Sequence, residues 1–296
     1  MGNILTKQFY RQRKDFEDSC VGRDAGLTFP EGVICSTDIA YADDGIKAHM
    51  LDIYRPEDSQ EKNLPVIINV HGGGLIIGNK EFNRYFCALL CKKGFLVYSI
   101  EYRLIPDCLM YDQISDVFMA MDYIKERLAA DGGDLSHVYM AGDSGGECLI
   151  TYANAIQNST NIARAANVTP SGLRINALGL ISGMFYTSRF DKIGLFLPKY
   201  LYGRDYKKTS FAKYVNPENR ELLNSLAPVW LVTSHNDFLR RYTTDFEKAL
   251  TRAEREHELV AFPKNKKLIH AFSVFEPFLP ESSEVIDMMV EYFRKF

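Results

Sequence analysis

The segment Gly142-Asp143-Ser144-Gly145-Gly146 places a serine between small residues in the pattern G-x-S-x-G. It follows an apolar run over residues 138–141 and precedes a helical apolar pattern over residues 149–156. A serine on a tight strand-to-helix turn presents its hydroxyl group as a nucleophile, and the free N–H groups of the helix can stabilise an oxyanion. We interpret Ser144 as the nucleophile of an acyl transfer, with Asp143 in a supporting role. A plain glycine-rich turn is the alternative, and the strand-turn-helix context favours the nucleophile.

A second glycine-rich segment, His71-Gly72-Gly73-Gly74, also ends an apolar run. Consecutive glycines allow the backbone to approach a ligand with its N–H groups turned inward. We expect the N–H groups of Gly73, Gly74 and Gly145 to form an oxyanion hole. His71 is expected to organise this loop rather than to act as a base. A phosphate-binding loop is the alternative, but neither the Lys-Ser/Thr sequence nor the G-x-G-x-x-G spacing is present.

Such a nucleophile needs an acid and a histidine, which follow it in that order in α/β-hydrolases. Asp237 follows the apolar run over residues 229–234, and His270 is the histidine that follows the run over residues 259–262. We therefore predict Ser144, Asp237 and His270 as a catalytic triad.

Two other residues compete for these roles. Asp245 falls within the helical pattern after Asp237, where we expect it to be solvated. His235 lies at the correct end of a strand but shares a loop with Asp237. It could hardly also take the position of a base opposite that acid.

The rest of the chain supplies the elements that must position these residues. Short apolar runs alternate with helical patterns, which is typical of a mainly parallel sheet covered by helices. The expected parallel strands are 66–70, 95–100, 138–141, 175–182, 229–234 and 259–262, and the clearest helical patterns are 114–128, 149–156, 242–255 and 285–293. Asp43-Asp44-Gly45 separates two further strands, 33–40 and 46–54, in a hairpin. The expected fold class is α/β, with a mostly parallel eight-stranded sheet and helices on both faces.

We expect a single domain over residues 1–296 with two additions. Residues 1–30 are polar and are expected to be helical. Residues 185–224 are rich in aromatic side chains without a strand pattern, which indicates a helical cap or lid. We expect its aromatic residues to form walls for the alcohol part of an aryl or sugar ester. The alternative for this insertion is a structural excursion that only packs on the domain.

Together these residues resemble the hormone-sensitive-lipase-like branch of the α/β-hydrolase fold, the bacterial esterase/lipase "fold-3" group. The resemblance runs from about residue 51 to about residue 272 and rests on five motifs: HGGG at 71–74, YRLIPD at 102–107, GDSGG at 142–146, DFLR at 237–240 and HAF at 270–272. It implies that Asp116 supports the site without reacting. The chain departs from the family pattern at Gly145, where alanine is usual, at Met110-Tyr111, where Phe-Pro is usual, and at Arg241-Tyr242, where an acidic pair is usual.

Composition and charge indicate which binding partners and which cellular compartment to expect. The 296 residues carry a net charge of −3, so no basic surface for nucleic acid is expected. No apolar stretch approaches the roughly 18 residues that span a bilayer, so we expect no stable membrane insertion. Early basic residues argue against a signal peptide, and six cysteines without paired spacing favour a cytoplasmic protein. The sequence Met1 to Thr6 also matches a myristoylation pattern.

These observations predict a serine carboxylic-ester hydrolase that needs no cofactor or metal. Short-chain, aryl or acetylated-sugar esters are the expected small-molecule substrates. An amidase or formamidase with the same triad is one alternative, and a non-catalytic ligand-binding member of the fold is another. The sequence leaves open whether the chain is a monomer or a homodimer.

Overall fold

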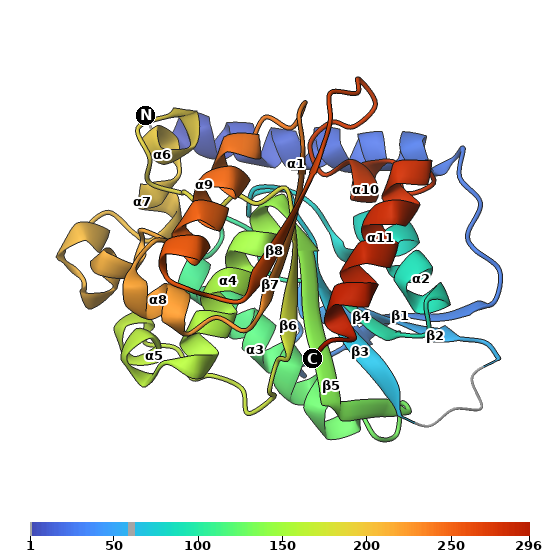
Figure 1. Ribbon diagram of the computed structural model, residues 1–296. Helices are drawn as coiled ribbons and strands as arrows, with labels where there is room; N and C mark the ends of the chain where they lie inside the picture. The colour runs from blue at the N-terminus through green and yellow to red at the C-terminus, as the bar shows by residue number, and fades with distance from the viewer. Residues whose placement is uncertain (1, 59–62) are drawn as a thin grey trace.

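The computed structural model describes residues 2–58 and 63–296 (Figure 1). These residues form one eight-stranded sheet in the order β1-β2-β4-β3-β5-β6-β7-β8. Its strands are β1 (Val33–Ala40), β2 (Met50–Pro56), β3 (Leu64–Val70), β4 (Leu96–Ile100), β5 (Gly133–Asp143), β6 (Ala177–Ile181), β7 (Val229–Ser234) and β8 (His257–Phe262). Strands β3 to β8 pair in parallel, whereas β2 is antiparallel to both β1 and β4.

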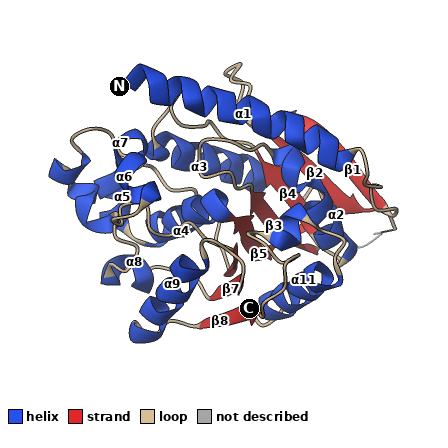
Figure 2. Ribbon diagram, turned by 90° about the horizontal axis from the view of Figure 1, so that it is seen from above, coloured by secondary structure: helices blue, strands red, loops and turns tan. Residues whose placement is uncertain are grey.

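Helices cover both faces of this sheet (Figure 2). The helical elements of the described residues are α1 (Gly2–Asp24), η1 (Lys80–Asn83), α2 (Arg84–Lys92), α3 (Met110–Arg127), α4 (Ser144–Asn158), α5 (Thr160–Ala166), α6 (Lys192–Phe196), α7 (Pro198–Leu201), η2 (Tyr206–Lys208), η3 (Ser210–Tyr214), α8 (Arg220–Asn224), α9 (Arg240–Arg252), α10 (Phe272–Phe275) and α11 (Pro280–Phe293). Helices α3, α4 and α9 pack on one face, and α2 and α11 pack on the other. The central strands are mostly apolar because both of their faces are buried.

The expected fold class is confirmed, although several strand boundaries differ from the prediction, most of all the first residues of β2 and β5. Strand β2 begins at Met50 rather than at Ile46, because residues 46–49 form a turn closed by the bond from His49 N–H to Ile46 C=O. Strand β5 begins at Gly133, five residues early, because the amides of Asn63 and Leu64 bind the carbonyl group of Gly132. Long-range pairing thus extends a strand into residues whose types favour a turn.

The parallel arrangement explains how distant residues reach one place. Strands β3, β5, β7 and β8 all run in the same direction, so the segments that follow them leave from one edge of the sheet. The carboxyl edge of a parallel sheet is where such folds bind ligands. The HGGG segment, Ser144, Asp237 and His270 all lie in these segments.

Helix α1 lies across this carboxyl edge and spans the sheet from one face to the other (Figures 1 and 2). Arg13 fixes it there, because its guanidinium group donates to the carbonyl oxygens of Ile76 and Ile105 at 2.8 and 2.6 Å. Phe9 packs against Tyr200 with ring centroids 5.2 Å apart. The helix expected near the N-terminus is therefore attached to the segments that follow β3 and β4. The myristoylation pattern begins at Met1, which lies outside the described residues.

The insertion at residues 185–224 consists of short helical elements with a core of their own. Phe211 and Tyr214 are fully buried, and the hydroxyl group of Tyr152 on α4 donates to the carbonyl oxygen of Tyr214 at 2.8 Å. Most of this segment therefore packs on α4 and α5. No helix within residues 2–58 and 63–296 is long and apolar enough to cross a membrane.

Candidate active site

Ser144 lies at the junction of β5 and α4, in a left-handed backbone conformation with φ of 49°. This conformation is uncommon for residues with a side chain, and it lifts the serine out of the line of the strand. A Cβ atom at Gly142 or at Gly146 would lie 2.5 or 2.2 Å from the carbonyl oxygen of Val70. The end of β3 thus passes so close to the turn that only glycine fits two residues before and two residues after Ser144.

Ser144, His270 and Asp237 form one hydrogen-bonded chain. His270 Nε2 lies 3.0 Å from Ser144 Oγ, and His270 Nδ1 lies 2.7 Å from Asp237 Oδ1. With the proton on Nδ1 donated to the carboxylate, Nε2 is free to accept the hydroxyl proton of the serine. His235, the competing histidine, is exposed and contacts Arg240 instead.

The carboxyl group of Asp237 is buried and well supplied with donors. Its Oδ2 accepts from Thr233 Oγ1 at 2.9 Å, and its Oδ1 accepts from the N–H group of Leu239 at 2.8 Å. Burial alone would raise the pKa of Asp237, but the hydrogen bond and charge of His270 and the Leu239 amide outweigh it. The net pKa lies below the usual value. Asp237 is therefore ionised and can orient the imidazole ring.

The HGGG segment folds over the start of α4. Gly72 N–H donates to Asp143 Oδ1 at 3.0 Å, and Asn83 Nδ2 donates to the same oxygen. Gly73 and Gly74 both have positive φ, and the Gly73 carbonyl group closes a turn with the amides of Ile76 and Ile77. Within the described residues the N–H groups of Gly73 and Gly74 have no hydrogen-bond acceptor. They are available to a ligand.

His71 is fully buried beneath this loop and faces acceptors on both sides. Its Nδ1 lies 2.8 Å from the carbonyl oxygen of Gly72, and its Nε2 lies 2.8 Å from Glu101 Oε1. Burial lowers the pKa of His71, but Glu101 and the Gly72 carbonyl group more than reverse this, so the net pKa is raised. An imidazolium ring that donates from both nitrogens fits these contacts. His71 therefore holds the loop and is not placed to act as a base.

Asp116 forms no hydrogen bond with Ser144, Asp237 or His270. It is buried on α3, where its carboxylate binds the Nε and Nη2 atoms of Arg103 at 2.9 and 2.6 Å and also accepts from the Arg103 backbone N–H. Neighbouring Gln113 donates to the carbonyl oxygens of Arg103 and Leu75. Asp116 thus anchors the segment after β4, which joins the HGGG loop where the N–H group of Ile105 donates to the carbonyl oxygen of Leu75 at 2.9 Å.

Gly145 is in unusually close contact with the HGGG loop. A Cβ atom at this position would lie 2.8 Å from the backbone nitrogen of Gly74 and 2.7 Å from that of Leu75. Both contacts are with backbone, which cannot rotate away as a side chain can. The glycine that distinguishes this chain from the family pattern therefore lets the loop lie nearer to Ser144 than alanine would allow.

Gly145→Ala is therefore expected to lower kcat by about tenfold or more, because the added methyl group would displace the loop N–H groups that we expect to stabilise the oxyanion. KM should change little. Steady-state kinetics on one ester, with thermal unfolding as a check on folding, tests this. Wild-type kcat in Gly145→Ala would show that catalysis does not depend on the close approach of the loop to residue 145.

A pocket of about 310 Å³ opens beside Ser144 and His270. Its walls are almost wholly apolar: Phe16 from α1, Ile76 and Ile77 after the HGGG segment, Phe82, Met184, Ile193, Leu197, Phe238, Leu239 and Phe275. Phe82 packs against both Phe16 and Phe275, with ring centroids 4.8 and 4.7 Å away. These three rings close one side of the pocket.

The expectation that aromatic residues of the 185–224 insertion would form the substrate walls is wrong. Tyr202 and Phe211 are buried within the insertion, and Phe190 is 94% exposed. The insertion contributes only the aliphatic residues Ile193 and Leu197 to the lining. The aromatic walls come from α1, η1, α10 and the segment after β7.

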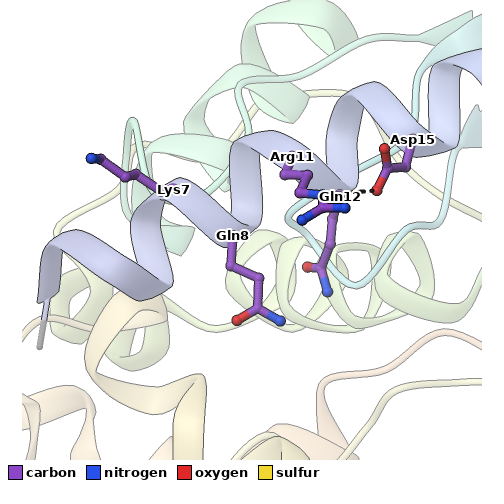
Figure 3. Close-up of a pocket in the computed structure, with 5 residues that line it drawn as sticks. All are labelled: Lys7, Gln8, Arg11, Gln12 and Asp15. Carbon is purple, nitrogen blue, oxygen red and sulfur yellow. Dashed lines mark ion pairs between the residues drawn. The ribbon is translucent and has the colours of Figure 1, made fainter.

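A separate hollow lies beside α1 (Figure 3). It has a volume of about 470 Å³ and is lined by Lys7, Gln8, Arg11, Gln12 and Asp15, all from this one helix. All five side chains are exposed, and Arg11 and Asp15 form a loose ion pair of 3.8 Å. It contains no residue of the serine–histidine–aspartate chain, and we regard it as a feature of the solvated helix surface.

A sequence profile of the alpha/beta hydrolase fold matches residues 67–274, more than two thirds of the chain. The chain belongs to the alpha/beta hydrolase fold family. This confirms the family expected from the five motifs. The match begins within β3 and ends within α10, so it includes every segment that contributes to the serine–histidine–aspartate chain.

Among curated proteins, this alpha/beta hydrolase fold member is 28% identical over 184 residues to a probable isoprenylcysteine alpha-carbonyl methylesterase of Oryza sativa subsp. japonica, with 58% of the chain and 44% of the relative covered. It is 30% identical over 131 residues to a tuliposide A-converting enzyme of Tulipa gesneriana, with 40% of the chain and 35% of the relative covered. The chain thus spans less than half the length of these relatives.

Solved structures resemble the whole chain. Esterase B from Lactobacillus rhamnosis superposes with a TM-score of 0.92 at 23% identity, over 99% of this chain and 95% of that one. The same esterase is also known in a form inhibited by a C4-C4 tributyrin phosphonate. A hyperthermophilic esterase from Pyrobaculum calidifontis gives a TM-score of 0.72 at 22% identity, with 97% and 91% covered. At these identities the likeness establishes the fold.

Proposed function

We propose that the chain is a serine carboxylic-ester hydrolase that works through an acyl-enzyme. The observation that carries this proposal is the continuous hydrogen-bonded chain from Ser144 through His270 to the buried carboxylate of Asp237. Free N–H groups beside the nucleophile and an apolar pocket support it. No other group is required for the chemistry.

In the first half of the reaction, Ser144 Oγ attacks the ester carbonyl carbon while His270 Nε2 accepts the hydroxyl proton. Asp237 stabilises the imidazolium ring that forms. The N–H groups of Gly73, Gly74 and Gly145 hold the oxyanion. The tetrahedral intermediate then collapses, and His270 gives the proton to the departing alcohol.

In the second half, water enters the place of the alcohol. His270 Nε2 removes a proton from the water as it attacks the acyl carbon, and the same N–H groups hold the second oxyanion. When this intermediate collapses, Ser144 Oγ leaves the acyl carbon and takes the proton back from His270. The products are a carboxylic acid and the free enzyme.

A fluorophosphonate probe tests this proposal directly. We expect one equivalent to react with the wild-type chain and to map to the peptide that contains Ser144, with concurrent loss of ester turnover. A panel of p-nitrophenyl esters and matching anilides separates an esterase from the amidase alternative, because only the leaving group differs. A chain that is neither labelled nor active would favour the ligand-binding alternative.

The pocket favours compact substrates. Its volume of about 310 Å³ is at the lower end of the range for ligand sites, and three phenylalanine rings close it on one side. The C4 phosphonate bound by esterase B of the same fold agrees with short acyl groups. We therefore propose short-chain esters over long-chain lipids, with aryl and acetylated-sugar esters as further candidates.

Butyrate esters are accordingly expected to give a higher kcat/KM than laurate esters. Phe16→Ala should shift that ratio toward laurate by about tenfold, because it removes apolar wall where extra methylene groups would extend. Val21→Ala is the matched control, since Val21 lies on the same helix and is 73% exposed. An unchanged ratio in Phe16→Ala would show that α1 does not limit the acyl group.

We further propose that the chain is one domain and that α1 and residues 185–224 together form its cap. Phe16, Ile193 and Leu197 support this, because they bring both segments to the pocket. Arg13 also supports this proposal, because its hydrogen bond to the carbonyl oxygen of Ile76 joins α1 to a segment that lines the pocket. The part of the insertion after Leu197 stabilises this cap by packing on α4 and α5.

A further inference from the structure

Glu147 is a fully buried carboxyl group that the mechanism above does not use. It lies in the first turn of α4, three residues after the nucleophile, and none of its surface is exposed. Neither of its carboxyl oxygens has a hydrogen-bond partner within residues 2–58 and 63–296. A buried acid without a partner is rare, because burial of an unpaired charge is very costly.

Gly183 provides the space that this side chain occupies. A Cβ atom at Gly183 would lie 2.3 Å from Glu147 Cδ and from both carboxyl oxygens. The carboxyl group therefore fills a slot that exists only because residue 183 lacks a side chain. Glu147 and Gly183 fit together as a pair.

The turn at residues 182–184 contacts both the residue after His270 and the backbone of Ser144. Ser182 Oγ accepts a hydrogen bond of 3.0 Å from the N–H group of Ala271, the residue after His270. The N–H group of Met184 donates to the carbonyl oxygen of Ser144 at 3.1 Å, and Met184 lines the pocket. A shift of this turn would therefore move the histidine loop, the nucleophile and a pocket wall together.

The surroundings of Glu147 oppose a negative charge. The carboxyl groups that face it are Asp237, from the segment after β7, and Asp143, at the end of β5. Burial raises the pKa of Glu147 well above its usual value, and these two carboxylates raise it further. The N-terminal turn of α4 favours an anion only modestly, which is a small effect beside burial without a partner.

We propose that Glu147 is a positioning residue that works as an uncharged carboxylic acid, filling the slot at Gly183 to hold the 182–184 turn, and that its ionisation switches the site off at alkaline pH. Once ionised, the carboxylate would be repelled by Asp237 and Asp143 and would leave the slot. The turn that supports Ser144 and the His270 loop would then lose its fixed position. The alkaline switch rests on the proposed ester hydrolysis. The protonation state of Glu147 is independent of that proposed function.

The protonation state is tested by unfolding in urea from pH 5 to pH 8. An acid whose pKa is raised by folding stabilises the chain fully below its unfolded pKa, and that stability is lost as the pH rises through the folded pKa. The unfolding constant of the wild type should therefore rise tenfold per pH unit relative to that of Glu147→Gln. Glu126→Gln, at an exposed site on α3, should follow the wild type. Parallel curves for wild type and Glu147→Gln would overturn the proposal.

Infrared spectroscopy of the wild type gives the same information without a variant. We expect a band of a protonated buried carboxyl group at pH 7 that disappears reversibly at alkaline pH. A spectrum with carboxylate bands only at pH 7 would contradict the proposal. Because neither measurement needs a substrate, they decide the state of Glu147 independently of ester turnover.

The switch is tested by the pH dependence of kcat/KM on one short-chain ester. We expect Glu147→Gln to stay within about threefold of the wild type at pH 7 and to keep its activity at alkaline pH, where the wild type declines reversibly. Glu147→Ala, which empties the slot, should lower kcat about tenfold at pH 7 and should not show the additional alkaline decline of the wild type. Identical alkaline declines in wild type and Glu147→Gln would overturn the switch. A wild type inactive on all esters would instead contradict the proposed function.

Discussion

Ser144→Ala is expected to lower kcat for a good ester substrate by a factor of about 10⁴ to 10⁶, because it removes the atom that would form the proposed acyl-enzyme. His270→Ala should cost a similar factor. The double variant should lose little more than either single one, since residues that act as a unit are far from additive. Steady-state kinetics with fluorophosphonate labelling measures all three.

The fold should be unaffected by Ser144→Ala. Among the described side chains, the hydroxyl group forms a hydrogen bond with His270 alone, so we expect its loss to leave the packing around the turn in place. Thermal unfolding of the variant within a few degrees of the wild type is the control. Turnover at the wild-type rate in a variant that is not labelled would place the nucleophile elsewhere in the chain.

Asp237→Asn is expected to lower kcat by a factor of about 10⁴, with little change in KM. An amide at this position donates where His270 Nδ1–H needs an acceptor, and the imidazole would then hold its proton on Nε2. That nitrogen lies 3.0 Å from Ser144 Oγ and could no longer accept the serine proton. The pH dependence of kcat separates this effect from a loss of folding.

Asp122→Asn is the matched control, because Asp122 is exposed on α3. It should keep wild-type kcat. Asp245, the other acid of the nearby sequence, forms an ion pair of 2.8 Å with Arg189 and does not contact His270. If Asp245→Asn proved more damaging than Asp237→Asn, the acid of the proposed triad would have to be reassigned.

The sequence alone indicated the mostly parallel sheet, and it assigned the residues of the proposed triad to the segments that follow its strands. The run over residues 66–70 is rich in valine and isoleucine, as expected of a strand that is buried on both faces. The structure places β3 there, at Leu64–Val70. The glycines two residues before and after Ser144 could be recognised in the sequence alone. The structure gives their physical reason, which is the close approach of Val70. Asp237 and His270 followed from the order of the strands, because parallel strands deliver their ends to one edge.

The sequence also indicated a helix at the N-terminus but not its place. Nothing in the polar composition of residues 1–30 shows that Phe16 closes the pocket or that Arg13 reaches Ile76 and Ile105. These are contacts between residues some 60 to 90 positions apart, and the side chains that make them are ordinary surface types elsewhere. Similarly, the aromatic residues of the insertion were assigned to the pocket, whereas Phe211 and Tyr214 form a core against α4.

Glu147 illustrates the same division within the site itself. Read along the chain, it is an acid in the first turn of a helix, where negative charge is favourable. Only the tertiary structure places it opposite Gly183, with Asp237 and Asp143 as neighbours and no partner. Local sequence determined what backbone sterics impose on adjacent residues, such as the turn around Ser144. The long-range packing of the chain decided burial, charge state and the walls of the pocket, because these depend on segments far apart in the sequence.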